Sequence, residues 1–255
     1  DLVSGTDTLN VVASGNISSL ALATMSNIDT GNLTGTSGSD SITLSGAQLD
    51  AILIGSGTIN LGSGSSDTIN LTSTSSDLNI LGSNSNTSIQ GVEAISAATA
   101  AAGVTINLSG QTEGFSITGS ANTDTIVAGA GNDSIAAGGG NDILTGGSGS
   151  DQFVFNTALN AATNIDQITD FNVVADTIVL DNAIFTAITG TGTLTSAQFV
   201  ANTSGTAQDA SDRIVYETDT GKLFYDNNGN AAGGATQFAQ LAAGLALTNN
   251  DFLIV

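Results

Sequence analysis

The stretch "AGAGNDSIAAGGGNDILTGGSGSDQFVFN" (128–156) decides the fold, because an aspartate recurs in it at every ninth position. Asp133, Asp142 and Asp151 are evenly spaced, and Asp124 extends the series one step toward the N-terminus. Each aspartate follows a glycine-rich or polar run and precedes, two residues later, a large apolar side chain. The chain therefore repeats a short unit that combines glycine, an acid and a hydrophobe.

Four consecutive units share an aspartate in sixth place and an apolar residue in eighth place. Glycine permits the positive φ angles of tight turns, and a three-residue strand points its middle side chain inward. Two units therefore predict one coil of a β-solenoid, with coils stacked ~4.8 Å apart and turns two units apart aligned on one edge. The units read GSANTDTIV (119–127), AGAGNDSIA (128–136), AGGGNDILT (137–145) and GGSGSDQFV (146–154).

Stacked turns predict a metal site, with Asp124 beside Asp142 and Asp133 beside Asp151. Carboxylates this close repel each other unless a cation lies between them. Calcium suits the gap because it accepts carboxylates and carbonyls together, whereas magnesium demands a tighter octahedron and zinc prefers His or Cys. Ordinary Asx turns are the alternative, but four units in register favour calcium. The expected carbonyl ligands are Gly129, Gly131, Gly138, Gly140, Gly147 and Gly149.

Residues 119–154 resemble the RTX (repeats-in-toxin) nonapeptide array, with consensus G-G-x-G-x-D-x-apolar-x. The resemblance implies an all-β, parallel β-roll, calcium-dependent folding and export by a type I secretion system. The sequence departs from the consensus at Asn122, where glycine is expected, and at Ala128 and Ala137, which begin two units. The first unit is therefore the weakest edge of the array.

Composition agrees with a cation as the main partner. The 255 residues include 23 acidic and 2 basic side chains, for a formal net charge of −21. Such a chain repels nucleic acid and anionic lipid, because phosphate binding requires Lys and Arg. It contains no His and no Cys, so it can build neither a Ser-His-Asp triad nor a thiol nucleophile. We therefore expect no enzyme in these residues, and no apolar run reaches the ~18 residues of a transmembrane helix.

Residues 1–118 contain similar glycine, aspartate and apolar patterns at less regular spacing. "GTSGSDSIT" (35–43) and "GSGSSDTIN" (62–70) match the repeat at glycine, aspartate and the apolar place. We expect residues 1–118 to form an irregular β-solenoid in which Asp40 and Asp67 supply further calcium sites. The alanine-rich "VEAISAATAAAG" (92–103) predicts a short helix or a corner of a coil.

Residues 156–255 change character, with longer strands and both basic residues. "IDQITDFNVVADTIVL" (165–180) resembles the segment that caps RTX arrays, and its Asp170 and Asp176 either bind calcium or turn the chain. "RIVYETDTGKLFYDNNGNAAGGATQFAQL" (213–241) predicts a hairpin, a loop and a short helix. The closing "ALTNNDFLIV" (246–255) resembles the C-terminal export signal of type I substrates, and an apolar strand would have the same pattern.

Within that hairpin segment, Asp226, Asn228 and Asn230 have the alternating spacing of a calcium loop. No acid follows at the twelfth position of such a loop, so an ordinary turn is favoured.

Three regions and three classes of function follow. The regions are the irregular solenoid (1–118), the nonapeptide β-roll (119–155) and the C-terminal cap with its secretion signal (156–255). We favour a non-catalytic, calcium-stabilised extracellular or cell-surface protein, such as a surface-layer subunit or adhesin, that self-assembles through calcium. The second class is the export and folding module of a secreted protease or lipase, with its catalytic domain before Asp1. The third is a flat ligand-binding solenoid, for which "TSTSS" (72–76) is a brief threonine signal.

The beginning of the chain carries a further expectation. The sequence opens on Asp1 without a polar capping element. Because an open solenoid edge must be capped or paired, we expect that edge to continue into more solenoid or to meet a neighbouring subunit.

Overall fold

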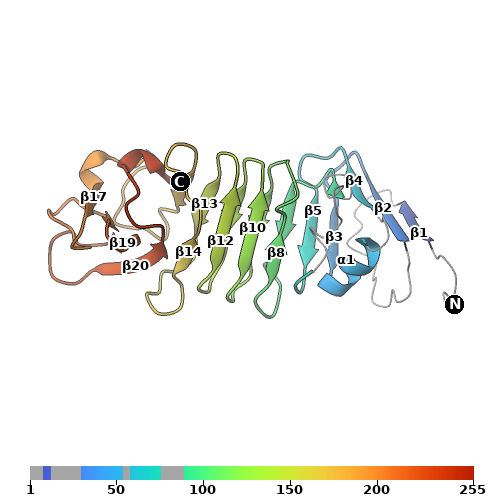
Figure 1. Ribbon diagram of the computed structural model, residues 1–255, viewed down its shortest axis with the longest axis horizontal. Helices are drawn as coiled ribbons and strands as arrows, with labels where there is room; N and C mark the ends of the chain where they lie inside the picture. Colours follow the sequence, from blue (N-terminus) through green and yellow to red (C-terminus); the bar gives the residue numbers. More distant parts are fainter. Residues whose placement is uncertain (1–7, 13–29, 54–57, 76–88) are drawn as a thin grey trace.

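The computed structural model describes residues 8–12, 30–53, 58–75 and 89–255. It confirms an all-β solenoid, in which short strands stack along the long axis of the molecule (Figure 1). Two strands form each coil, one on each side of a shared core. The strands of successive coils pair in parallel, as expected when the chain returns to the same edge after every coil.

One side of the stack consists of two sheets. β1 pairs with β2, and the order continues through β4 to β6, while β8, β10, β12 and β14 lie consecutively in the second sheet. These strands are β1 (Thr8–Val12), β2 (Thr30–Thr36), β4 (Thr58–Gly62), β6 (Ile89–Gln90), β8 (Thr105–Asn107), β10 (Thr125–Gly129), β12 (Ile143–Gly147) and β14 (Asp166–Ile168).

The other side is a single nine-stranded sheet that runs through upstream and array coils without a break. Its order from the C-terminal end is β16-β21-β15-β13-β11-β9-β7-β5-β3. The strands are β3 (Ser41–Leu44), β5 (Thr68–Leu71), β7 (Ala94–Ser96), β9 (Ser116–Thr118), β11 (Ser134–Ala136), β13 (Gln152–Phe155), β15 (Thr177–Leu180), β16 (Gly192–Thr193) and β21 (Phe252–Ile254).

The register confirms two nonapeptides per coil. Thr125 pairs with Ile143 and Ser134 pairs with Gln152, so each strand meets the strand two units later. β10 and β12 are five residues long rather than the expected three. In β10 the alternation continues past the eighth place, because the small Ala128 is buried as completely as Ile126.

The core of the solenoid is a set of apolar columns between the two sides. In the nine-stranded sheet, each coil contributes one inward side chain that stacks on its equivalent in the next coil. Each fully buried side chain of this size contributes about 1.5–3 kcal/mol. The members of this column are Ile42, Ile69, Ile95, Ile117, Ile135, Phe153, Ile178 and Phe252, each at most 1% exposed.

Two upstream features differ from expectation. Helix α1 (Gly46–Leu53) follows β3, and its Leu49 and Leu53 are fully buried on one helix face. In the alanine-rich stretch 92–103, residues 94–96 form β7 and residues 98–99 form a turn, so the helix alternative is wrong and only the part after β7 is a corner. Residues 72–75 of the threonine-rich stretch form no strand, and residue 76 lies outside the described residues. No helix within the described residues is long and apolar enough to cross a membrane.

The C-terminal region continues the stack and closes it. The predicted hairpin is present as the antiparallel pair β18 (Ile214–Glu217) and β19 (Lys222–Asp226). The predicted helix after it is wrong, because β20 (Ala235–Gln240) is a strand that pairs with β19 and β14. Its Phe238 packs against Phe155 and Phe185. The other elements here are the 3-10 helices η3 (Ser196–Gln198) and η4 (Asn249–Asp251) and strand β17 (Phe199–Asn202).

The chain end is an apolar strand within the solenoid. β21 pairs in parallel with β15, and β16 pairs with its other side. Phe252 is fully buried. Residues 252–254 therefore form the last coil of the nine-stranded sheet, whatever other role this segment has.

Candidate metal centre

A ladder of carboxylates connects neighbouring turns of the array. The backbone N–H of Asp124 donates to Asp142 Oδ1 at 2.7 Å, and that of Asp133 donates to Asp151 Oδ1 at 2.9 Å. In both pairs the partners are 18 residues apart, which is one coil. The structure therefore places together the aspartates that the repeat predicts to be neighbours. Each hydrogen bond fixes one oxygen of the carboxylate and sets the direction of the other.

The second carboxylate oxygen has no hydrogen-bond partner. The Oδ2 atoms of Asp133, Asp142 and Asp151 are all buried and unpartnered, and none of these residues is more than 2% exposed. Burying an ionised carboxylate is costly unless an opposite charge accompanies it. The two basic residues of the sequence, Arg213 and Lys222, lie in the C-terminal region, and Lys222 lies 3.8 Å from Glu217. The array therefore fits a bound cation.

Burial also shifts the protonation of these acids. It raises the pKa of Asp133 and Asp142 to about 6. Burial, reinforced by the Asp142 carboxylate, raises the pKa of Asp166 to about 8. Burial likewise raises the pKa of Asp151 and Asp176. Burial therefore penalises the ionised form of each of these acids, and a divalent cation would remove that penalty.

The glycines of the turns allow close stacking of backbone carbonyls. Gly138 and Gly147 have φ of 99° and 97°, in the left-handed region that favours glycine. A Cβ atom on Gly147 would clash with the carbonyl oxygen of Gly129, and one on Gly149 would clash with that of Gly131. Carbonyl oxygens of one coil therefore lie directly against the glycines of the next.

Hydrogen bonds also hold the carbonyl groups of these turns. The Gly129 carbonyl accepts a hydrogen bond from Ser148 N at 2.9 Å, and the Gly138 carbonyl accepts one from Thr157 Oγ1 at 2.6 Å. A carbonyl oxygen has a second lone pair, so these bonds leave room for a cation. Within the described residues, no three His, Cys, Asp or Glu side chains cluster as a metal site. Carbonyl oxygens must therefore complete any site here, and the individual glycine ligands, Gly131 and Gly140 included, stay predictions.

The C-terminal aspartates extend the ladder. Asp176 Oδ1 accepts a hydrogen bond from Asp151 N at 3.1 Å, in the same way that Asp151 accepts one from Asp133. Asp170 accepts bonds from Gly146 N and Gly147 N at 3.0 and 2.8 Å. Both aspartates therefore hold the turn of the fourth unit, and calcium ligation by either of them stays a prediction.

Sequence analysis missed two acids of the carboxylate ladder, Asp166 and Glu93. Asp166 Oδ1 accepts a hydrogen bond from Asp142 N at 3.1 Å, and Glu93 Oε2 accepts one from Asp67 N at 2.7 Å. Asp166 follows Asp142 by 24 residues and not 18, and it follows "NAATNI" without a glycine. The usable signal was an acid at the start of a short alternating strand or directly before it, as in "DQI" and "EAIS".

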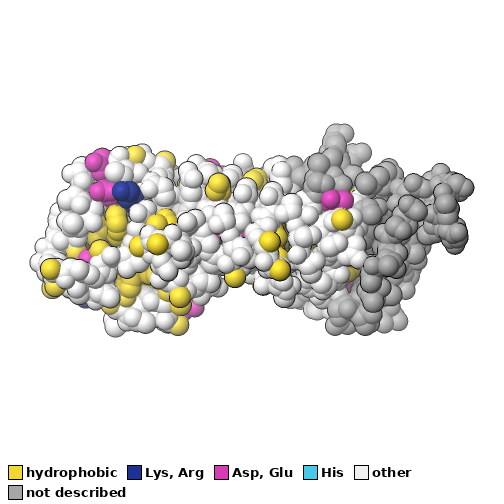
Figure 2. Space-filling view, turned by 90° about the horizontal axis from the view of Figure 1, so that it is seen from below, with side chains coloured by type: hydrophobic (Ala, Val, Ile, Leu, Met, Phe, Trp, Pro, Cys, Tyr) yellow, Lys and Arg dark blue, Asp and Glu magenta, His cyan; other side chains and the backbone are white. Residues whose placement is uncertain are grey.

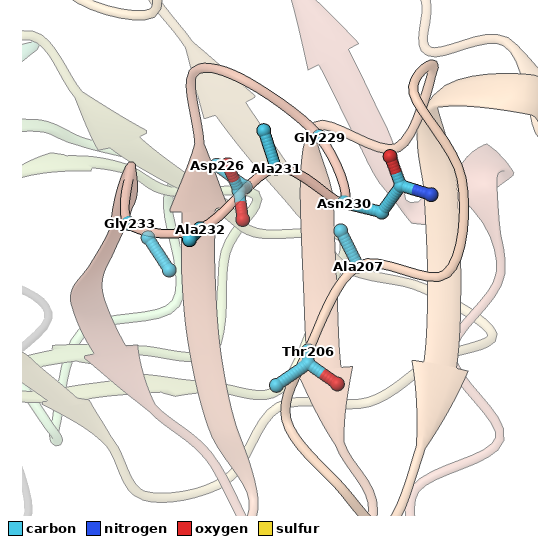
Figure 3. Close-up of a pocket in the computed structure, with 9 residues that line it drawn as sticks. Thr206, Ala207, Asp226, Gly229, Asn230, Ala231, Ala232 and Gly233 are labelled. Carbon is cyan, nitrogen blue, oxygen red and sulfur yellow. The ribbon is translucent and has the colours of Figure 1, made fainter.

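The possible calcium loop at Asp226 is an ordinary turn. Asp226 Oδ1 accepts a hydrogen bond from Asn228 N at 3.1 Å, and Asn230 Nδ2 donates to Gln208 O at 3.2 Å. Asp226 lines a cavity of about 410 Å³ whose walls are mostly alanine and glycine. Figure 3 shows the Asn230 amide pointing away from Asp226, so the two side chains do not converge on one ion.

Because the ladder acids are buried, they leave little charge on one face of the array. Figure 2 shows that the face over the middle of the stack carries mostly uncharged atoms, with acidic groups only as small spots. The ladder carboxylates therefore lie inside the turns, where a cation would bind.

These features define a calcium-binding β-roll. Residues 118–153 match the family model for the RTX calcium-binding nonapeptide repeat, in four copies. The segment is therefore an RTX calcium-binding array, and its ion is calcium. No curated protein matches the chain.

Proposed function

We propose that the chain is a non-catalytic, extracellular structural protein of surface-layer or adhesin type, whose β-roll folds on calcium after type I secretion. Proteins with RTX repeats are typically secreted. The observation that carries the proposal is the unbroken nine-stranded sheet, which extends from β3 to β21, far beyond the matched repeats. The solenoid is therefore the body of this chain and not a short appendage.

Calcium binding is coupled to folding in this proposal. Without the ion, buried carboxylates of successive coils face one another, and each short strand buries only one or two side chains. A cation that binds only the folded turns adds its binding free energy to the stability of the fold. Low calcium inside a cell then favours an unfolded chain for export, and high external calcium folds it.

The test combines folding and assembly of the full 255-residue chain. Circular dichroism should change from coil toward β-structure as calcium is added, and a chelator should reverse the change. Sedimentation velocity in millimolar calcium should show self-association that the chelator also reverses, because copies of a chain with a formal net charge of −21 repel one another unless a cation offsets that charge. A spectrum that calcium leaves unchanged would contradict the folding part of the proposal.

The second candidate is the folding and export module of a secreted enzyme. The extensive C-terminal cap around β17–β20 favours it, because a covered end of the solenoid suits a module attached to another domain. A monomer at every calcium concentration, combined with calcium-dependent folding, would select this candidate over the surface-layer one.

A further inference from the structure

The carboxylate ladder occurs a second time, in coils that the RTX match does not cover. Asp40 N donates to Asp67 Oδ1 at 2.6 Å, and Asp67 N donates to Glu93 Oε2 at 2.7 Å. All three acids directly precede strands of the nine-stranded sheet, β3, β5 and β7. They therefore occupy the same edge as Asp133 and Asp151, although the matched repeats begin only at residue 118.

The upstream ladder is separated from the array by one coil without an acid. Phe115 lies at the equivalent place before β9, and its N–H donates to Asp133 Oδ1 at 2.7 Å. The upstream acids are also spaced differently, 27 and 26 residues apart instead of 18. The upstream coils therefore reproduce the geometry without the nonapeptide spacing.

Asp67 is the buried acid that points to a ligand. It is 0% exposed, and its Oδ2 atom is buried without a hydrogen-bond partner, like those of the array acids. Asp40 beside it is 2% exposed. The sequence provides no basic residue before Arg213 that could neutralise this pair. Burying an ionised carboxylate in this position is costly unless a cation accompanies it.

Carbonyl oxygen and carboxylate converge at Gly64. A Cβ atom on Gly64 would clash with Asp67 Oδ1 and would lie 2.5 Å from the carbonyl oxygen of Gly38. Oxygens from two successive turns, 35–40 and 62–67, therefore face the same bare Cα. In the same way, a Cβ atom on Gly35 would lie 2.7 Å from Asp40 Oδ2. Hard oxygen donors of mixed type are what calcium prefers.

We propose that the turns 35–40 and 62–67 form a calcium site of their own, held by the carboxylates of Asp40 and Asp67 and the carbonyl of Gly38. Glu93 orients Asp67 by accepting its N–H. The site binds one ion and fixes the stacking of the β3 coil on the β5 coil, independently of the array.

The experiment measures calcium in the full 255-residue chain, with calcium alone as the probe and magnesium as the comparison ion. Native mass spectrometry counts the bound ions, and hydrogen exchange reports on the peptides 36–45 and 62–72. In the parent chain, calcium but not magnesium should slow exchange in these peptides. No calcium-induced protection there would overturn the proposal, even if the array binds calcium normally.

Two variants locate the ion. Asp67→Asn removes the buried charge, and Gly64→Ala keeps every acid but fills the space in front of Asp67 Oδ1. Each should bind one calcium fewer than the parent and lose the calcium-induced protection of 36–45, while exchange at 125–155 stays unchanged. Asp219→Asn, an exposed turn residue, is the charge-matched control and should keep the full count. Variants that retain the full count and the protection of 36–45 would refute the site.

Discussion

The array coils and the upstream coils stack in the same way but contain different numbers of residues per coil. Between Asp133 and Asp151 one coil takes 18 residues, whereas between Asp40 and Asp67 it takes 27. In both regions an inward isoleucine stacks on its neighbour, and a carboxylate accepts the N–H of the previous coil. The difference lies in the loops, because upstream coils carry extra residues such as α1.

The comparison shows that different features determine the register between strands of successive coils and the number of residues in each coil. Apolar columns and carboxylate contacts recur in every region, so they fix which residues stack. The glycine turns keep the array coils short, because positive φ and bare Cα atoms allow the tightest approach. Regular spacing is therefore a property of the turns and is not needed for the ladder.

The largest expected effect is that of pH on the calcium-free protein. A folded pKa of about 6 for Asp133 and Asp142 lies above the ordinary 3.8, so the folded chain binds more protons than the unfolded chain. This stabilisation is complete below pH 3.8 and is lost as pH rises through 6, and for Asp166 through about 8. In chelator, circular dichroism and urea unfolding should therefore show a larger folded fraction at about pH 4 than at about pH 8.

Calcium should reverse that trend, because it binds the ionised carboxylates. The same unfolding series with calcium should show stability rising with pH. If the free energy of unfolding changed with pH by the same amount with and without calcium, the buried acids would not be the calcium ligands.

Among the aspartates of the array, Asp142 should be the one whose replacement by asparagine weakens calcium binding most. Its Oδ1 accepts the N–H of Asp124, and its N–H donates to Asp166, so it connects three coils. The amide keeps the first bond but removes the charge at the buried second oxygen. The calcium midpoint of folding should rise at least about tenfold, which corresponds to about 1.4 kcal/mol.

Calcium titration followed by circular dichroism measures that shift, and Asp219→Asn provides the exposed control. The effect should stay within the array, with upstream exchange at 36–45 unchanged. A midpoint equal to that of the control would show that Asp142 carries no ion.

Core truncation should cost the same in both regions. Ile135 in the array and Ile95 upstream are both fully buried in the same column. Replacing either by alanine should lower the free energy of unfolding by about 2–5 kcal/mol in calcium. Ile143→Ala, at a side chain that is 43% exposed, should cost much less in the same urea experiment. A harmless Ile95→Ala would show that the upstream column does not support the fold.

Two glycines of the array turns should differ in how well they tolerate alanine. Gly147→Ala forces a side chain onto a φ of 97° and against the Gly129 carbonyl, which should cost about 2 kcal/mol. Gly139→Ala, in the preceding turn, meets nothing closer than 3.7 Å and has no positive φ. It should change stability by less than about 1 kcal/mol. Thermal unfolding measures the stability of both variants. Equal losses of stability would show that close contact between the glycine and the carbonyl of the next coil is unimportant.

The sequence predicted the array well because its spacing is regular. An aspartate at every ninth position is enough to pair Asp124 with Asp142 and to place Ile126 in the core. Asp166 and Glu93 were missed because their coils have irregular lengths, and a fixed spacing cannot find a contact that depends on a loop.

Local propensity also failed where tertiary pairing decides. "ATQFAQ" has the composition of a helix, but β20 is a strand because β19 and β14 offer edges on both sides. Helix α1 carried a readable signal in the four-residue spacing of Leu49 and Leu53, which are both buried.

The closure of the nine-stranded sheet has a consequence for how copies of the chain can join. β21 covers the edge of β15, and the two-residue β16 is all that remains beyond it. A terminal strand this short offers almost no backbone for a further strand to pair with. Head-to-tail growth into a fibre by strand pairing requires two open ends on every subunit. Growth of the nine-stranded sheet by strand pairing past β16 is therefore disfavoured.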